Sequence, residues 1–130
     1  MKKILIVSAE FYPEISSILK KSTTKKLVDF DVDFFIVPGV FEIPVVISKY
    51  IDKYDGFIAL GCVIKGETPH FDLISKSVID GIMNISIKSK KPIGNGILTC
   101  LNKKQSLARA KKGGEAADAI KHVLMNDPKK

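Results

Sequence analysis

The clearest structural signal in this sequence is residues 56–89, GFIALGCVIKGETPHFDLISKSVIDGIMNISIKS. Residues 56–64 are almost continuously apolar, as is typical of a strand covered on both faces in a parallel sheet. Residues 71–89 carry apolar side chains every three or four positions, at Phe71, Ile74, Val78, Ile82 and Ile85. That spacing predicts an amphipathic helix. The stretch therefore predicts a strand, a short loop and a helix in direct succession.

The same alternation runs through the rest of the chain. Three more apolar runs predict strands, at residues 2–8, 32–37 and 93–99, and the first two are also nearly continuous. Helical patterns lie between and after them, at residues 13–30, 41–53, 103–110 and 114–126. Strands alternating with helices over short connections favour right-handed crossovers. We therefore predict one α/β domain over residues 1–130, a three-layer α/β/α sandwich with a four-stranded parallel sheet of the flavodoxin-like type.

Composition excludes several classes of protein. Hydrophobic residues make up 45% of the 130 residues and charged residues 27%, which is typical of a globular chain. No apolar run approaches the roughly 18 residues that span a bilayer, so we expect a cytoplasmic protein with no membrane partner. The net charge of +7 comes from lysines in scattered pairs without interleaved aromatic residues, which argues against a nucleic-acid partner. Cys62 and Cys100 lack metal-ligand spacing, and we expect free thiols and no metal.

Function is expected at the carboxyl ends of the predicted strands, where α/β proteins bind ligands. The loop of residues 65–70 combines Gly66, Thr68 and His70 just before a helix. Backbone amides at a helix start favour phosphate or carboxylate, and histidine can exchange protons near neutral pH. The alternative is a capping loop, in which Thr68 caps the helix and His70 is merely exposed. Spacing alone leaves both interpretations open.

Three other features are candidates for the same site. Arg109 is the only arginine among 21 basic residues, and its planar fork can grip a phosphate at two points. Residues 37–44, VPGVFEIP, place Phe41 and Glu42 at a turn before a helix, and Phe11 follows the first strand. An aromatic ring there could stack on a planar ligand. The alternative for Arg109 is a surface residue of a helix. The alternative for residues 37–44 is an ordinary strand-turn-helix joint, and the alternative for Phe11 is packing in the core.

Taken together, these segments resemble the lumazine synthase family. The resemblance rests on Phe11, VPGVFEIP (37–44), GCVIKGETPHFDLIS (61–75), GILT (96–99), Arg109 and KGGEAA (112–117). It implies condensation of 5-amino-6-(D-ribitylamino)uracil with 3,4-dihydroxy-2-butanone 4-phosphate. The products would be 6,7-dimethyl-8-ribityllumazine, phosphate and water, in the penultimate step of riboflavin biosynthesis. The resemblance implies no metal and no organic cofactor.

The resemblance also implies residue roles. His70 would transfer protons and, with Arg109, form the catalytic pair, with Arg109 reaching the phosphate from the neighbouring subunit. The phosphate would lie against Gly66, Glu67 and Thr68. The ribitylaminouracil would contact Phe11, Val40, Phe41, Glu42, Cys62, Val63, Ile64, Asn95 and Lys112. Within this set, Phe11 would stack on the pyrimidine, Glu42 would accept from ribityl hydroxyls, and the backbone of Val63 and Ile64 would face the uracil edge.

Three departures from the family pattern concern the site and the assembly, the last two the oligomeric state. Asn95 stands where many members have an aromatic residue reaching in from the neighbouring subunit, although a subgroup from α-proteobacteria also has Asn there. The loop between Arg109 and Gly113 is short, and the first core strand begins almost at once. The family assembles as pentamers or sixty-subunit shells, and we expect a homopentamer with sites between adjacent subunits. The rival functions are a paralogue with other substrates and a non-catalytic flavin or lumazine binder.

Overall fold

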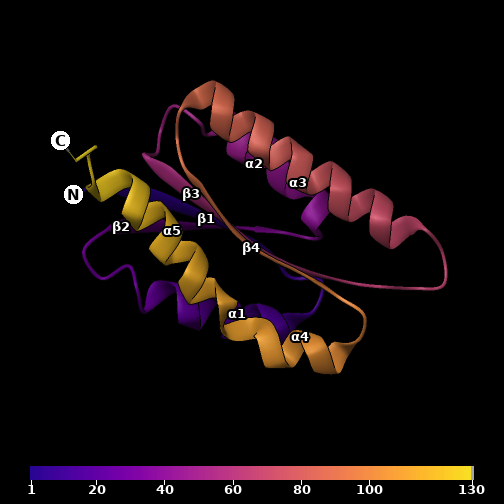
Figure 1. Cartoon of the computed structure of the whole chain (residues 1–130). Coiled ribbons are helices and arrows are strands. Elements are labelled where there is room, and N and C mark those ends of the chain that lie inside the picture. Colours follow the sequence, from indigo (N-terminus) through magenta and orange to yellow (C-terminus); the bar gives the residue numbers. More distant parts are fainter. Residues whose placement is uncertain (130) are drawn as a thin grey trace.

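A central sheet of four parallel strands organises the protein. A computed structural model describes residues 1–129, and its strands are β1 (Lys3–Ala9), β2 (Asp31–Val37), β3 (Gly56–Ile64) and β4 (Ile93–Cys100). Their order in the sheet is β2-β1-β3-β4 and every neighbouring pair is parallel. The carboxyl ends of all four strands therefore lie at one edge of the sheet (Figure 1).

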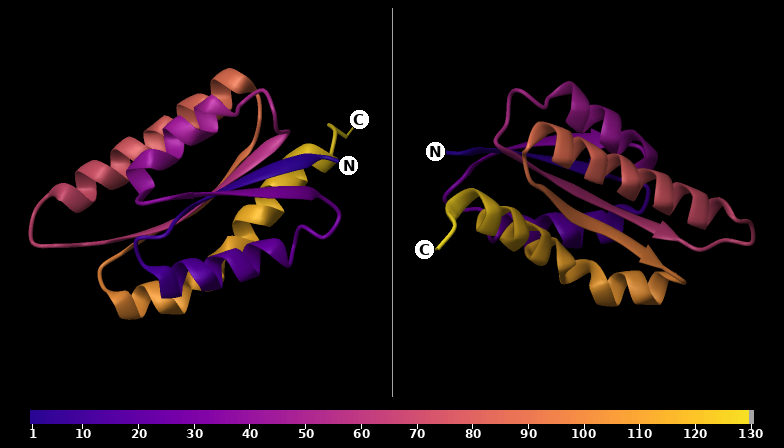
Figure 2. Two further views of the ribbon diagram at one scale, coloured as in Figure 1. Left: turned by 180° about the vertical axis from the view of Figure 1, so that it is seen from behind. Right: turned by 45° about the horizontal axis from the view of Figure 1, so that its top comes forward.

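Helices cover both faces of the sheet, which confirms the three-layer prediction. One face carries α1 (Pro13–Thr24), α4 (Lys103–Arg109), the short 3₁₀ helix η2 (Ala110–Lys112) and α5 (Gly113–Met125). The other carries the 3₁₀ helix η1 (Val40–Glu42), α2 (Ile43–Lys49) and α3 (His70–Ser89). The two helical layers lie on opposite sides of the strands in both views of Figure 2. No helix within residues 1–129 is long and apolar enough to cross a membrane.

Two apolar clusters fill the spaces between the layers. Ile4 and Ile6 of β1 pack towards α1 and α5, whereas Leu5 and Val7 pack towards α2 and α3. Both faces of β1 are thus buried, because successive side chains of a strand point to opposite faces. Each fully buried aliphatic side chain contributes about 1.5–3 kcal/mol, so the near-continuous apolar runs of β1 and β3 stabilise the three layers directly.

The structure corrects the prediction for the second strand. Phe34 and Ile36 of β2 are 48% and 49% exposed, so the expected cover on both faces is wrong for this strand. The reason is its place at the edge of the sheet, beside β1 only. An apolar run shows that a strand can be buried, but it does not show whether a helix of the same chain reaches it.

Two helices end earlier than predicted, and one connection differs from the prediction. The helix predicted over residues 13–30 ends at Thr24, and the chain then turns with Leu27 and Phe30 buried. The pattern over residues 41–53 divides into η1 and α2 and ends at Lys49. The short connection after Arg109 is the 3₁₀ turn η2 rather than a loop. In both shortened helices the apolar residues beyond the last helical turn still face the core, and their periodicity therefore overextended the prediction.

Candidate functional site

A cleft of about 330 Å³ opens at the carboxyl edge of the sheet. It is formed by the ends of β1 and β3, the turn after β2 and the start of α3. Its lining consists of Phe11, Tyr12, Gly39, Val40, Phe41, Cys62, Val63, Ile64, His70 and Ile74. Segments far apart in the sequence meet here because parallel strands end at one edge. The fold thus brings together seven of the predicted site residues, namely Phe11, Val40, Phe41, Cys62, Val63, Ile64 and His70.

The floor of the cleft depends on close packing between β3 and η1. A Cβ atom on Gly61 would lie 2.5 Å from Val40 Cγ1 and 3.2 Å from Ala9 Cβ. Only glycine therefore lets η1 settle onto the end of β3. Cys62 is buried next to it, while Val63 and Ile64 are half-buried at the cleft.

The turn after β2 is held by Glu42. The Gly39 N–H donates to Glu42 Oε1 at 3.0 Å, and the Glu42 N–H donates back to the Gly39 carbonyl at 3.2 Å. The ordinary strand-turn-helix joint that the sequence left open as an alternative for residues 37–44 is therefore present. Glu42 lines the adjoining hollow between η1 and α3 with Phe41 and Val78, and it is not among the residues that line the cleft.

Two aromatic rings form one wall of the cleft. Phe11 is 69% exposed, so the core-packing alternative is wrong for the single chain. Its ring lies edge-on to Tyr12, with centroids 4.9 Å apart and planes at 77°. In an edge-on pair the positive edge of one ring meets the negative face of the other, and this attraction favours a fixed orientation of the Phe11 ring. Tyr12 was missed from the sequence, although its position directly after a strand-end aromatic was a usable signal.

The loop of residues 65–70 is exposed along its whole length. It projects from the sheet between β3 and α3 (Figure 1). The Thr68 hydroxyl accepts from the His70 N–H at 3.4 Å, a long hydrogen bond at the start of α3. A Cβ on Gly66 would meet nothing within 4 Å, so the backbone there is open to approach. His70 lines the cleft, whereas Gly66, Glu67 and Thr68 are not among the residues that line it.

Three further predicted residues lie outside the cleft of their own chain. Arg109 and Lys112 line a separate hollow on the side of α4 and α5. Asn95 is exposed in β4 opposite Ala59, and its Oδ1 accepts from the Ile97 N–H at 3.1 Å. One chain therefore supplies the aromatic wall and the imidazole of the predicted site, but not its arginine.

Cys62 lines the buried part of the cleft and is not suited to act as a nucleophile. Its thiol lies 3.2 Å from Ser106 Oγ. Burial raises the pKa of Cys62, and the hydrogen bond to Ser106 offsets part of that rise. A thiol with a raised pKa is a poor nucleophile at neutral pH. Within residues 1–129 no cluster of three or more His, Cys, Asp or Glu could hold a metal ion.

Comparison with known proteins relates the whole chain to one family. The family model described as 6,7-dimethyl-8-ribityllumazine synthase matches residues 1–126. A relative of that name from Limosilactobacillus reuteri is 43% identical, over 94% of this chain and 85% of the relative. Relatives of the same name from Bartonella tribocorum and Agrobacterium fabrum are 41% and 40% identical. Each alignment covers 89% of this chain, with 83% and 88% of the relative.

Proposed function

We infer the function from one premise: the chain belongs to the 6,7-dimethyl-8-ribityllumazine synthase family. It is an enzyme that condenses 5-amino-6-(D-ribitylamino)uracil with 3,4-dihydroxy-2-butanone 4-phosphate. The products are 6,7-dimethyl-8-ribityllumazine, phosphate and water, in riboflavin biosynthesis. No observation on the described residues favours the non-catalytic binder. We also propose a cytoplasmic location, which suits a biosynthetic enzyme with two free thiols.

The observation that carries the site assignment is the meeting of Phe11, His70 and the end of β3 in one cleft. We propose that Phe11 stacks on the pyrimidine, because its exposed ring is already oriented by Tyr12. The backbone of Val63 and Ile64 would hydrogen-bond the uracil edge. Val40, Phe41 and Glu42 would hold the ribityl chain, and Cys62 would close the cleft behind the ring.

His70 is proposed to transfer protons between the two substrates. Imine formation and phosphate elimination both need a group that gives and takes a proton near neutral pH. His70 lines the cleft at the first residue of α3. The neighbouring loop, with Gly66, Glu67 and Thr68, would receive the phosphate on its open backbone. Such donors stabilise the charge that develops on the leaving phosphate.

We propose that a second copy of the chain completes each site. Arg109, Lys112 and Asn95 lie outside the cleft of their own chain, and a neighbouring subunit could bring them to it. Large apolar side chains also remain exposed on β2, α2 and α3, namely Phe34, Ile36, Val45, Leu73, Met83 and Ile87. Exposed apolar patches of this kind mark interfaces. A homopentamer is the proposed assembly, and a dominant sixty-subunit species in native mass spectrometry would contradict it.

The reaction is tested by mixing the purified protein with both substrates and following lumazine fluorescence. We expect product formation well above the spontaneous reaction. A matched control is Lys88→Gln, because Lys88 is exposed near the far end of α3. A rate equal to the spontaneous one would contradict the proposed function.

The site roles are tested separately. Arg109→Lys keeps the charge but removes the planar fork, so it should raise the KM for the phosphate substrate more than His70→Ala does. His70→Ala should instead lower kcat. If Arg109→Lys behaved like the unmodified protein, the bidentate contact would be disproved even though the reaction stood.

A further inference from the structure

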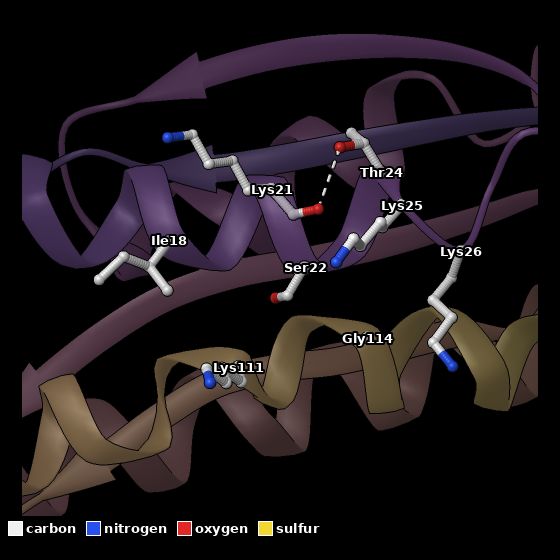
Figure 3. Close-up of a pocket in the computed structure, with 8 residues that line it drawn as sticks. All are labelled: Ile18, Lys21, Ser22, Thr24, Lys25, Lys26, Lys111 and Gly114. Carbon is white, nitrogen blue, oxygen red and sulfur yellow. Dashed lines mark hydrogen bonds between the residues drawn. The ribbon is translucent and has the colours of Figure 1, made fainter.

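A lysine-lined groove runs between α1 and α5, on the helical layer opposite α2 and α3. Its volume is about 730 Å³, and it is lined by Ile18, Lys21, Ser22, Thr24, Lys25, Lys26, Lys111 and Gly114. Figure 3 shows the lysines of α1 and the following turn above the groove and Lys111 below it. No residue of the cleft lines it. The groove is thus a second concave site, built from other elements.

The groove lies beside the point where α1 and the start of α5 cross closely. A side chain on Gly113 would collide with the Thr23 hydroxyl and the Leu19 carbonyl of α1. The Ser22 hydroxyl bridges the helices by donating to the Leu19 carbonyl at 3.0 Å and lying 3.4 Å from the Ala110 carbonyl. The crossing therefore fixes the walls, and the groove is part of the fold rather than a surface irregularity.

The charge of the groove is strongly one-sided. Four of its eight lining residues are lysines, and none is acidic. Lys26 pairs with Asp118 at 3.4 Å, but among residues 1–129 the ion pairs leave Lys21, Lys25 and Lys111 without a carboxylate partner. Like charges gathered in a concave surface concentrate a positive potential. An anion bound there would relieve their mutual repulsion.

We propose that this groove binds a small ligand bearing a chain of phosphate groups, as in inorganic tripolyphosphate or the triphosphate of a nucleotide. Lys25 and Lys111 approach from opposite walls, so a chain of phosphate groups lying in the groove can contact both. Lysine binds phosphate as a point charge and does not need the bidentate geometry of arginine. Single-stranded nucleic acid fits less well, because no aromatic side chain lines the groove for base stacking.

The groove should stay open in the assembled protein. Six of the exposed large apolar side chains lie on β2, α2 and α3, and the two on α5, Val123 and Met125, do not line the groove. Only Lys111 is shared with the hollow of Arg109 and Lys112, and binding of a phosphate chain does not require the proposed reaction.

The experiment measures tripolyphosphate binding to the whole protein by isothermal titration calorimetry at low salt. The variant Lys25→Gln with Lys111→Gln should weaken binding about tenfold, since exposed charge pairs contribute modestly but two are lost. Lys2→Gln with Lys88→Gln removes the same charge elsewhere and should change the affinity less than about twofold. Raising the salt concentration should weaken binding in every protein that binds.

The outcomes separate the groove from the active site. Equal losses in both double variants would show unspecific attraction and overturn the proposal. A loss in Arg109→Lys with none in the groove variant would place the ligand at the phosphate cradle and also overturn it. Comparison with ATP then identifies the source: tighter binding of ATP indicates a nucleotide, and equal binding indicates recognition of the phosphate chain alone. Lumazine formation is measured separately and should be unchanged in Lys25→Gln, because Lys25 lines the groove but neither the cleft nor the hollow of Arg109.

Discussion

Replacing Gly61 with alanine should disturb the packing between β3 and η1 that forms the floor of the cleft. The new Cβ would lie 2.5 Å from Val40 Cγ1, whereas carbon atoms in contact prefer about 3.5–4.0 Å. Either Val40 or the end of β3 must therefore shift by about 1 Å. Val40 is almost fully buried and begins η1, so the shift passes to the turn that carries Phe41 and Glu42.

The expected free energy follows from two opposing effects. Overpacking a core costs about 1–3 kcal/mol. The methyl group of alanine restricts the unfolded chain and returns about 0.4–1 kcal/mol. We therefore expect Gly61→Ala to lower the free energy of unfolding by about 1–2 kcal/mol. It should also raise the KM for the pyrimidine substrate, because Val40 lines the cleft.

A double-mutant cycle with Val40→Ala tests the proposed clash. Val40→Ala alone leaves a cavity and should also destabilise the protein. In the double variant the alanine at position 61 fills part of that cavity, so the two losses should fall short of additivity by about 1 kcal/mol. Urea unfolding followed by circular dichroism, at one protein concentration because assembly contributes to stability, measures all four proteins. Strict additivity, or unmodified stability in Gly61→Ala, would refute the steric argument.

Three further predictions concern the same chain. Ser106→Ala removes the hydrogen bond that lowers the pKa of Cys62, so thiol alkylation should need higher pH, and an unchanged pH profile would disprove that contact. The Asp33 carboxylate accepts from the Tyr54 hydroxyl at 2.7 Å and raises the pKa of Tyr54 to about 12; Asp33→Ala should move its absorbance titration down towards about 10. The raised pKa makes this pair stabilising below about pH 10, and the contribution is lost as pH rises through about 12. Stability that did not fall across that range would contradict the linkage. Glu42→Ala should destabilise the turn after β2 by about 1–2 kcal/mol, since it leaves an amide without its acceptor, whereas Glu42→Gln should keep most of the stability; equal losses in urea unfolding would argue against the cap.

The order and type of the secondary structure could be predicted because they are local properties. The apolar run of residues 56–64 became β3 with the same bounds, and the stripe over residues 71–89 became α3 one residue earlier. Helix ends were harder, because residues beyond Thr24 keep burying apolar side chains after the backbone has left the helix. Periodicity records which side chains face the core and not where helical hydrogen bonds stop.

The candidate site was predictable in part for the same reason. The sequence placed Phe11, the turn after β2 and the loop before α3 at strand ends, and a parallel sheet gathers strand ends at one edge. It could not show that Arg109 and Lys112 line a hollow separate from the cleft of the same chain. Nor could it show Tyr12 set edge-on against Phe11, because contacts between rings depend on packing.

The sequence by itself determined the strand and helix alternation, the absence of a long apolar span and the motif that relates the chain to its family. These follow from spacing and composition along the chain. Only the tertiary structure decided that scattered lysine pairs converge on one groove between α1 and α5, and that β2 is an exposed edge. Both depend on which surfaces meet, and the close crossing at Gly113 that shapes the groove joins residues about ninety positions apart. Such proximity arises from packing in three dimensions, which spacing along the chain does not record.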